Sequence, residues 1–147
     1  FEGQIDEPIQ LALDPDCGTD LPDIFLVGIP LFSQRAIDVL NAVGVTNFRA
    51  FDVVVKDERD GSVYTQYKAI NIVGAFSCLD LDRSEYDPSF KPPMMEIQKI
   101  VLDPSRIPDL HLFRLAEKTK VILVSDSLKE QMEKAKLVGV RFVEVEL

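Results

Sequence analysis

The sequence predicts an α+β fold: a single domain with a largely antiparallel sheet and about two main helices. Its 147 residues are enough to bury a core without disulfide or metal support. Only two segments show clear helical spacing, whereas many short runs are rich in β-branched and aromatic residues. Because helices and strands do not alternate regularly along the chain, a parallel α/β sheet is not expected.

The first 23 residues predict an irregular acidic arm, followed by a folded core over residues 24–147. Four turn-forming residues interrupt this arm: Pro8, Pro15, Gly18 and Pro22. No period of 2 or 3.6 residues is sustained there, and one short element is expected near residues 9–13.

The best-signalled helix lies in the segment LFSQRAIDVLNAVG, whose apolar residues between 36 and 43 follow helical spacing. Ser33 is expected to be its N-cap, with Phe32 and Ile37 at the positions of a hydrophobic staple. Gly44 stands where a left-handed residue commonly ends a helix.

Most of the remaining elements are predicted as strands. The segment FRAFDVVVKDERDGSVYTQYKAINIVG predicts a hairpin with a charged turn at residues 56–62. Residues 75–93 are rich in acids, serine and proline and predict a loop with little regular structure. Further strands are expected at residues 96–103, 110–115, 121–124 and 140–147.

The second helix is predicted in SDSLKEQMEKAKLVG. Ser127 and Glu130 have the spacing of a capping box, and Gly139 is the expected stop. Its apolar stripe is formed by Leu128, Met132 and Ala135.

The uneven charge is the most informative feature of the composition. The net charge is −9, and residues 1–30 carry seven acidic residues and no Lys or Arg, against 18 acids and 16 bases in residues 31–147. Such a field repels phosphate backbones and anionic lipid and attracts a cationic partner. Binding to nucleic acid or membranes is therefore disfavoured; acidity that serves only solubility is the alternative.

Cysteine usage and hydropathy indicate a cytoplasmic protein. Cys17 and Cys78 form no C-x-x-C pair, so neither a disulfide framework nor a zinc site is expected, and a reducing compartment is the natural setting. The longest apolar runs are too short to span a bilayer.

His111, in PDLHLFRL, is the only histidine and thus the first candidate for proton transfer. Nothing near it in the sequence forms a recognisable arrangement with a nucleophile and an orienting carboxylate, so a structural role in a strand is predicted. No phosphate-binding loop, dinucleotide fingerprint or common hydrolase motif occurs, and no catalytic residue, metal or cofactor is predicted. The alternative is a small metal-dependent or carboxylate-using enzyme that uses Asp80 and Asp82 with His111.

The acidic segment DLDRSEYD raises the question of calcium binding. Asp80, Asp82 and Ser84 occupy the first, third and fifth positions of an EF-hand-like loop. The sixth position is Glu85 where glycine is needed, and the twelfth is Lys91 where a bidentate glutamate is needed. A solvated acidic loop is therefore the prediction.

Four segments, in this order, resemble a known family: PLFSQRAIDVL, YKAINIVGAFSCLDLDRSEYD, HLFRL and VILVSDSLKEQMEKAKLVGVRFVEVEL. They are similar to the immunity proteins of bacterial polymorphic toxin systems, typified by a myxobacterial immunity protein and long filed as a domain of unknown function. The resemblance runs from about Pro30 to the C-terminus. It implies a leading hydrophobic strand, which is expected to precede Phe1.

The resemblance implies a non-enzymatic cytoplasmic protein that binds and neutralises a cognate toxin. If that toxin is basic, electrostatic complementarity favours contact through the acidic arm and the acidic loop. Tyr86 and Phe90 are expected to be exposed aromatic anchors. The predicted partner-binding residues are Asp14, Asp16, Asp20, Asp80, Asp82, Glu85, Tyr86 and Asp87. A regulatory or scaffold module with residues 1–23 as a disordered tether is a further alternative.

Overall fold

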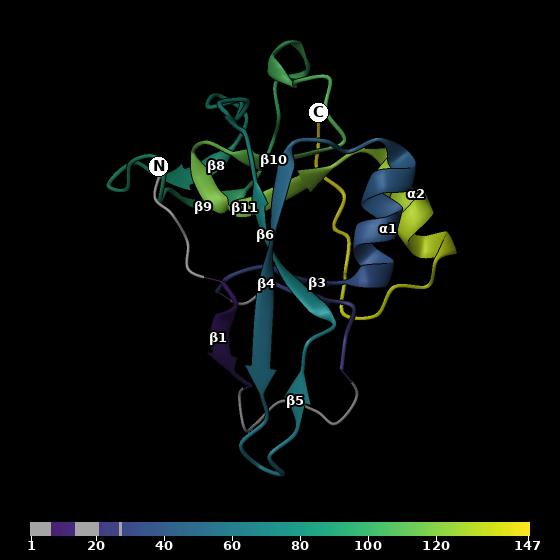
Figure 1. The fold of residues 1–147 in the computed structure, drawn as a ribbon. Coiled ribbons are helices and arrows are strands. Elements are labelled where there is room, and N and C mark those ends of the chain that lie inside the picture. The colour runs from purple at the N-terminus through teal and green to yellow at the C-terminus, as the bar shows by residue number, and fades with distance from the viewer. Residues whose placement is uncertain (1–6, 14–20, 27) are drawn as a thin grey trace. The chain divides into compact units, whose positions relative to one another are not determined.

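The computed structural model describes residues 7–13, 21–26 and 28–147. Within them it has two α-helices and eleven strands, and most of the strand pairs are antiparallel. The predicted α+β fold is therefore confirmed (Figure 1). In chain order the elements are β1 (Ile9–Ala12), β2 (Ile24–Phe25), β3 (Leu31–Ser33), α1 (Gln34–Val43), β4 (Phe48–Lys56), β5 (Val63–Tyr64), β6 (Tyr67–Ile72), β7 (Ala75–Phe76), β8 (Glu85–Asp87), β9 (Glu96–Lys99), the 3₁₀-helix η1 (Pro104–Arg106), β10 (Leu112–Leu115), β11 (Lys118–Val124) and α2 (Asp126–Lys134).

The chain divides into two compact units, each built from two stretches of sequence. Unit 1 comprises Phe1–Asn71 and Gln131–Val140, and unit 2 comprises Ile72–Glu130 and Arg141–Leu147. None of the helices in the described part of the chain is long and apolar enough to cross a bilayer.

Unit 1 is organised around a sheet with the strand order β1-β4-β6-β3-β2, with β5 paired to β4. The predicted hairpin is confirmed by the antiparallel register of Val55 opposite Tyr64. Strand β1 lies at the short element expected near residues 9–13 and pairs in parallel with β4. That part of the arm is therefore not an unpacked tether. The core residues of unit 1 are Leu31, Val53, Val55, Tyr67 and Ala69.

Helix α1 lies between Ser33 and Gly44, the residues predicted to begin and end it. The Ser33 hydroxyl accepts a hydrogen bond from the Ala36 N–H at 3.2 Å, and Gly44 ends the helix in the left-handed region with φ 93°. One face is buried through Ala36, Ile37 and Leu40. The N-cap, the C-terminal glycine and the buried apolar face all lie where the sequence predicts them, so the prediction for this helix is confirmed.

Unit 2 contains the three-stranded sheet β11-β10-β7 and the two-stranded sheet β8-β9. Strands β10 and β11 confirm the strands predicted at residues 110–115 and 121–124. The core residues are Cys78, Leu79, Met95, Leu102, Phe113, Leu115 and Leu123. The rings of Phe76 and Phe113 meet edge to face, with centroids 5.7 Å apart.

Two predictions of strand and loop are wrong. Residues 75–93 include β7, which pairs with the distant β10, and β8, which pairs with the nearby β9. Next to β7, the Ala116 N–H donates to the Phe76 carbonyl at 2.9 Å. Residues 141–147, in contrast, form no strand and are drawn as coil in Figure 1. Only Glu146 makes a β-bridge there, with Val101, and the apolar Val143 is 74% exposed.

The predicted ends of the second helix are also wrong. Helix α2 begins at Asp126, and the Ser125 hydroxyl accepts from the Leu128 N–H at 3.1 Å, so Ser125 and not Ser127 caps it. The helix ends at Lys134, and the left-handed Lys136 follows with φ 54°. Gly139 lies beyond the helix.

Candidate interaction surface

The acidic segment of residues 80–87 is a turn organised by its own first carboxylate. The Asp80 side chain accepts from the N–H groups of Asp82 and Arg83, each at 3.1 Å, and lies 3.9 Å from the Arg83 guanidinium. Because this carboxylate caps the turn, the first ligand position of the calcium pattern already serves the backbone. In the described residues no group of three or more His, Cys, Asp or Glu side chains could hold a metal ion.

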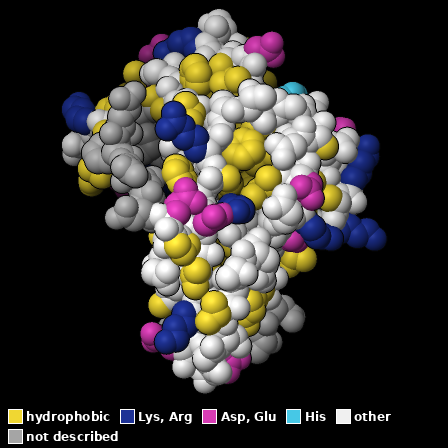
Figure 2. All heavy atoms as spheres, viewed as in Figure 1, with side chains coloured by type: hydrophobic (Ala, Val, Ile, Leu, Met, Phe, Trp, Pro, Cys, Tyr) yellow, Lys and Arg dark blue, Asp and Glu magenta, His cyan; other side chains and the backbone are white. Residues whose placement is uncertain are grey.

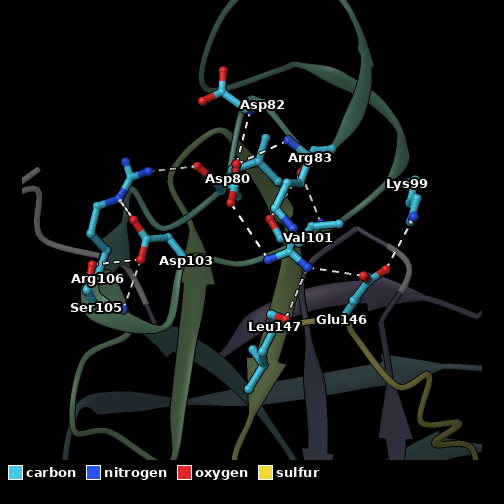
Figure 3. A network of polar contacts seen from close by, with 12 residues as sticks. Asp80, Asp82, Arg83, Lys99, Val101, Asp103, Ser105, Arg106, Glu146 and Leu147 are labelled. Carbon is cyan, nitrogen blue, oxygen red and sulfur yellow. Dashed lines mark hydrogen bonds and ion pairs between the residues drawn. The ribbon is translucent and has the colours of Figure 1, made fainter.

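A buried serine fixes this turn to the rest of unit 2. The Ser84 hydroxyl donates to the Val101 carbonyl at 3.0 Å and accepts from the Val101 N–H at 2.9 Å. The Asp80 N–H donates to the same carbonyl at 2.8 Å. The turn is therefore held in one conformation through its backbone (Figure 3).

Basic side chains compensate several of the carboxylates around this turn. Glu146 accepts from Arg83 at 3.2 Å and pairs with Lys99 at 3.2 Å, while Asp103 pairs with Arg106 at 2.9 Å (Figure 3). These pairs are largely exposed, so each contributes little to stability. They make this surface mixed in charge instead of uniformly acidic.

The structure brings five of the eight predicted partner-binding residues together on this turn and on β8. Asp82 and Glu85 are exposed, while Asp80 and Asp87 are half-buried. The Asp87 carboxylate accepts from the Ser89 N–H at 2.8 Å, and this bond holds the pKa of Asp87 below its usual value. The other three residues, Asp14, Asp16 and Asp20, lie outside the described residues.

The two aromatic residues expected as anchors differ in their surroundings. Tyr86 is half-buried and packs against the core of unit 2, so the expectation that it is an exposed anchor is wrong. Its ring lies on β8, where the register opposite Ile97 turns it toward the core. Phe90 is 47% exposed and stays available at the surface.

The described residues carry less net charge than the chain as a whole. Five acidic residues and no Lys or Arg lie outside them, which leaves twenty acids against sixteen bases. On the face shown in Figure 2, acidic and basic side chains are interspersed among small groups of hydrophobic ones. The strongest local excess of acid therefore belongs to the first thirty residues of the sequence.

His111 is placed by hydrogen bonds to the residue that caps α2. Its Nδ1 lies 2.7 Å from the Ser125 Oγ, and its carbonyl accepts from the Ser125 N–H at 2.9 Å. The same hydroxyl accepts from the Leu128 N–H, so His111 supports the start of the helix. These bonds favour the structural role expected for His111, which lies one residue before β10.

A groove of about 1030 Å³ lies within unit 2. Buried side chains of Leu102, Phe113 and Leu123 line its base, and the chain end at residues 142–147 lines one side. Asp80, Asp82 and His111 are not among its lining residues. The side chains on which the enzyme alternative depends therefore do not converge in this groove.

A family comparison identifies the chain. The model of the immunity protein family Imm11 matches residues 2–146. The chain belongs to the Imm11 immunity protein family. The match confirms the resemblance seen in the sequence and also includes the residues ahead of Pro30 that the resemblance left out. No curated protein shows significant similarity to this Imm11 chain.

One buried polar residue of this Imm11 chain was missed by the sequence analysis. Glu117 is 5% exposed, and its Oε1 accepts from the Ser77 hydroxyl at 2.7 Å and from the Leu79 N–H at 3.3 Å. Its Oε2 has no partner among the described residues. A glutamate in the turn between β10 and β11 has the pattern of an exposed residue, and nothing local indicates that it points inward.

Proposed function

We propose that this chain is a non-enzymatic immunity protein that binds a cognate bacterial toxin in the cytoplasm and neutralises it. The observation that carries the proposal is the Imm11 family match over nearly the whole chain. Neutralisation by binding needs a stable fold and a complementary surface, and it needs no nucleophile. The structural role of His111 and the lack of convergence with Asp80 and Asp82 are compatible with this function.

We further propose that the toxin is basic and that acidic side chains of this chain contact it. The net charge of −9 would raise the rate of association with a cationic partner. In this proposal Asp82, Glu85 and Asp87 contact the toxin directly, while Asp80 and Tyr86 hold the loop in its conformation. Asp14, Asp16 and Asp20 of the acidic arm are proposed as further contacts to the toxin.

Co-expression tests the proposal in living cells. The toxin gene adjacent to the gene for this chain is induced in a host cell with and without the chain, and survival is measured. Full survival with the chain supports the proposal. A matched control is the Leu115→Asp variant, which places a charge at a fully buried core position and should neither fold nor protect. Equal killing with and without the wild-type chain would contradict the function.

Co-purification at low and high salt then tests the charge of the interface. Binding that weakens as salt is raised supports an acidic contact surface, because salt screens interactions between exposed charges. Binding that does not change with salt would leave the immunity function in place and reject the acidic surface.

A further inference from the structure

The groove in unit 2 combines an apolar base with acidic residues along its sides. Leu102, Phe113 and Leu123 are buried side chains that line it. Among the charged residues of the lining, Lys129 is the single cation, against four carboxylates. The acidic residues of the lining are Asp109, Asp126, Glu144 and Glu146.

The chain end at residues 142–147 forms one side of the groove. Hydrogen bonds hold its last two residues, whereas Val143 before them is exposed. The Leu102 N–H donates to the Glu146 carbonyl at 2.9 Å, and Arg83 donates to both Glu146 and the Leu147 carbonyl. Val145 packs against the core of unit 2. Val143, however, is 74% exposed, so an apolar side chain beside the groove is left uncovered.

Three of the four carboxylates are available to a partner. Asp109, Asp126 and Glu144 are exposed and make no ion pair among the described residues, whereas Glu146 is paired with Arg83 and Lys99. The cation is held close to the chain end, because the Lys129 ammonium lies 6.0 Å from the centre of the Phe142 ring. The lining of the groove therefore has an excess of acidic over basic side chains beside its buried apolar residues.

We propose that this groove receives a basic segment of the cognate toxin. An apolar side chain of that segment would lie on the base beside Phe113 and Val143, and its Lys or Arg residues would pair with Asp109 and Glu144. The inference rests on the proposed function and names a docking surface for it. A small molecule fits less well, because ligand pockets enclose most of their ligand and this groove has an exposed side. A protein segment with an apolar anchor and a charged periphery suits an open groove.

Charge reversal tests the acidic contact. Asp109→Lys with Glu144→Lys should weaken binding of the full chain to the purified, catalytically inactivated toxin by about tenfold or more. The control is Glu58→Lys with Glu130→Lys, which changes the net charge equally at two exposed acids that do not line the groove. The control should change the affinity by less than about threefold, since only the long-range field differs. Equal weakening by both pairs would overturn the groove proposal.

Photo-crosslinking tests the apolar contact independently. Benzoylphenylalanine replaces Val143 beside the groove or, as a control, the 57% exposed Val63 in unit 1. The proposal predicts a covalent adduct with the toxin from position 143 and none from position 63. An adduct with a second copy of this chain, or no adduct at position 143, would overturn it.

The outcomes separate this inference from the function on which it rests. If the wild-type chain binds the toxin and both groove variants behave like their controls, the groove is not the docking surface but the immunity function stands. If the wild-type chain binds no toxin, the proposed function fails and the groove proposal fails with it.

Discussion

At the scale of single residues, the Glu117 side chain accepts hydrogen bonds in the protein interior, although the residue lies in the two-residue turn between β10 and β11. Its Oε1 accepts from Ser77 and from the Leu79 N–H beside the buried Cys78. A buried N–H without an acceptor costs about 1–3 kcal/mol. The acceptor at Glu117 is therefore expected to matter more for stability than its charge.

Glu117→Ala should lower the free energy of unfolding by about 1–3 kcal/mol, because the Leu79 N–H loses its acceptor. Glu117→Gln keeps an acceptor oxygen and should cost less than half as much. Urea unfolding of the two variants measures the difference. Equal losses in both would show that the charge, and not the hydrogen bond, is what the fold requires.

Cys78 should be chemically inert in the folded chain. Burial, with the nearby Glu117 charge adding to it, raises the pKa of its thiol to about 11, so little thiolate exists near neutral pH. In a Cys17→Ser background, iodoacetamide should modify Cys78 slowly in native buffer and rapidly in denaturant, as followed by mass spectrometry. Rapid modification under native conditions would contradict the burial of this residue.

At the scale of elements, the Asp23 carboxylate connects three segments of unit 1. It accepts from the Ser33 hydroxyl at 2.7 Å, from the Val138 N–H at 2.8 Å and from Arg35 at 3.2 Å. Burial alone would raise the pKa of Asp23, but these hydrogen bonds outweigh it and lower the pKa below 3.8. A lowered folded-state pKa contributes stability above the unfolded-state pKa, and this contribution is lost as pH falls through the folded-state value.

Asp23→Asn should therefore be less stable than wild type by about 1–3 kcal/mol at neutral pH, since hydrogen bonds to the carboxylate are weakened. The difference should narrow below about pH 4, because protonation then removes the same charge from the wild type. Urea unfolding at neutral and acidic pH gives both values. A difference that stays constant with pH would exclude the Asp23 charge as its cause.

Gly139 has a packing requirement that its sequence position does not reveal. Its φ is 90°, and a Cβ there would lie 2.3 Å from the Pro22 Cβ and 2.7 Å from the Ile24 carbonyl. Gly44 has a similar φ of 93°, but a Cβ there meets no atom within 4 Å. A comparison of alanine substitutions at these two glycines therefore separates the cost of a left-handed backbone from the cost of steric overlap within unit 1.

Gly139→Ala should destabilise unit 1 by clearly more than Gly44→Ala, for which about 1 kcal/mol is expected from the left-handed backbone alone. Thermal or urea unfolding of the two variants compares them directly. If Gly44→Ala costs as much as Gly139→Ala, the close approach to Pro22 carries no energetic weight.

The elements that could be predicted are those with complete local signals. Helix α1 has its cap at Ser33, its stop at Gly44 and an apolar face between them, so neighbouring residues determine it. Strand β7 has two residues, and its pairing comes from β10 far along the chain. The strand expected at residues 140–147 has the right alternation but receives only one bridge, from Val101. Pairing over a long sequence distance decides both cases, and no local pattern contains it.

The candidate surface could be predicted only in part, for the same reason. The acidic loop is a continuous segment, and its charge is visible in the sequence. The groove is built from residues 102–129 and 142–147, which only the fold brings together. Tyr86 is predicted from the sequence as an exposed aromatic anchor, yet it packs against the unit 2 core.

At the scale of the whole molecule, the proposed binding of a basic toxin rests on the net charge and on the family. The chain carries a net charge of −9 and belongs to the Imm11 immunity proteins. Association with a basic toxin should therefore be fast at low salt and should slow by about tenfold or more at high salt, while dissociation changes less. Stopped-flow mixing with inactivated toxin measures both rates. An association rate that does not depend on salt would contradict electrostatic steering.

The most direct test of the central claim is a titration of the purified toxin's activity with this chain. Neutralisation by binding predicts that activity falls in proportion to the chain added and is abolished near a one-to-one ratio. Toxin that stays fully active in an excess of the chain would contradict the proposed function. Loss of activity at far less than one chain per toxin would instead show that the chain acts catalytically.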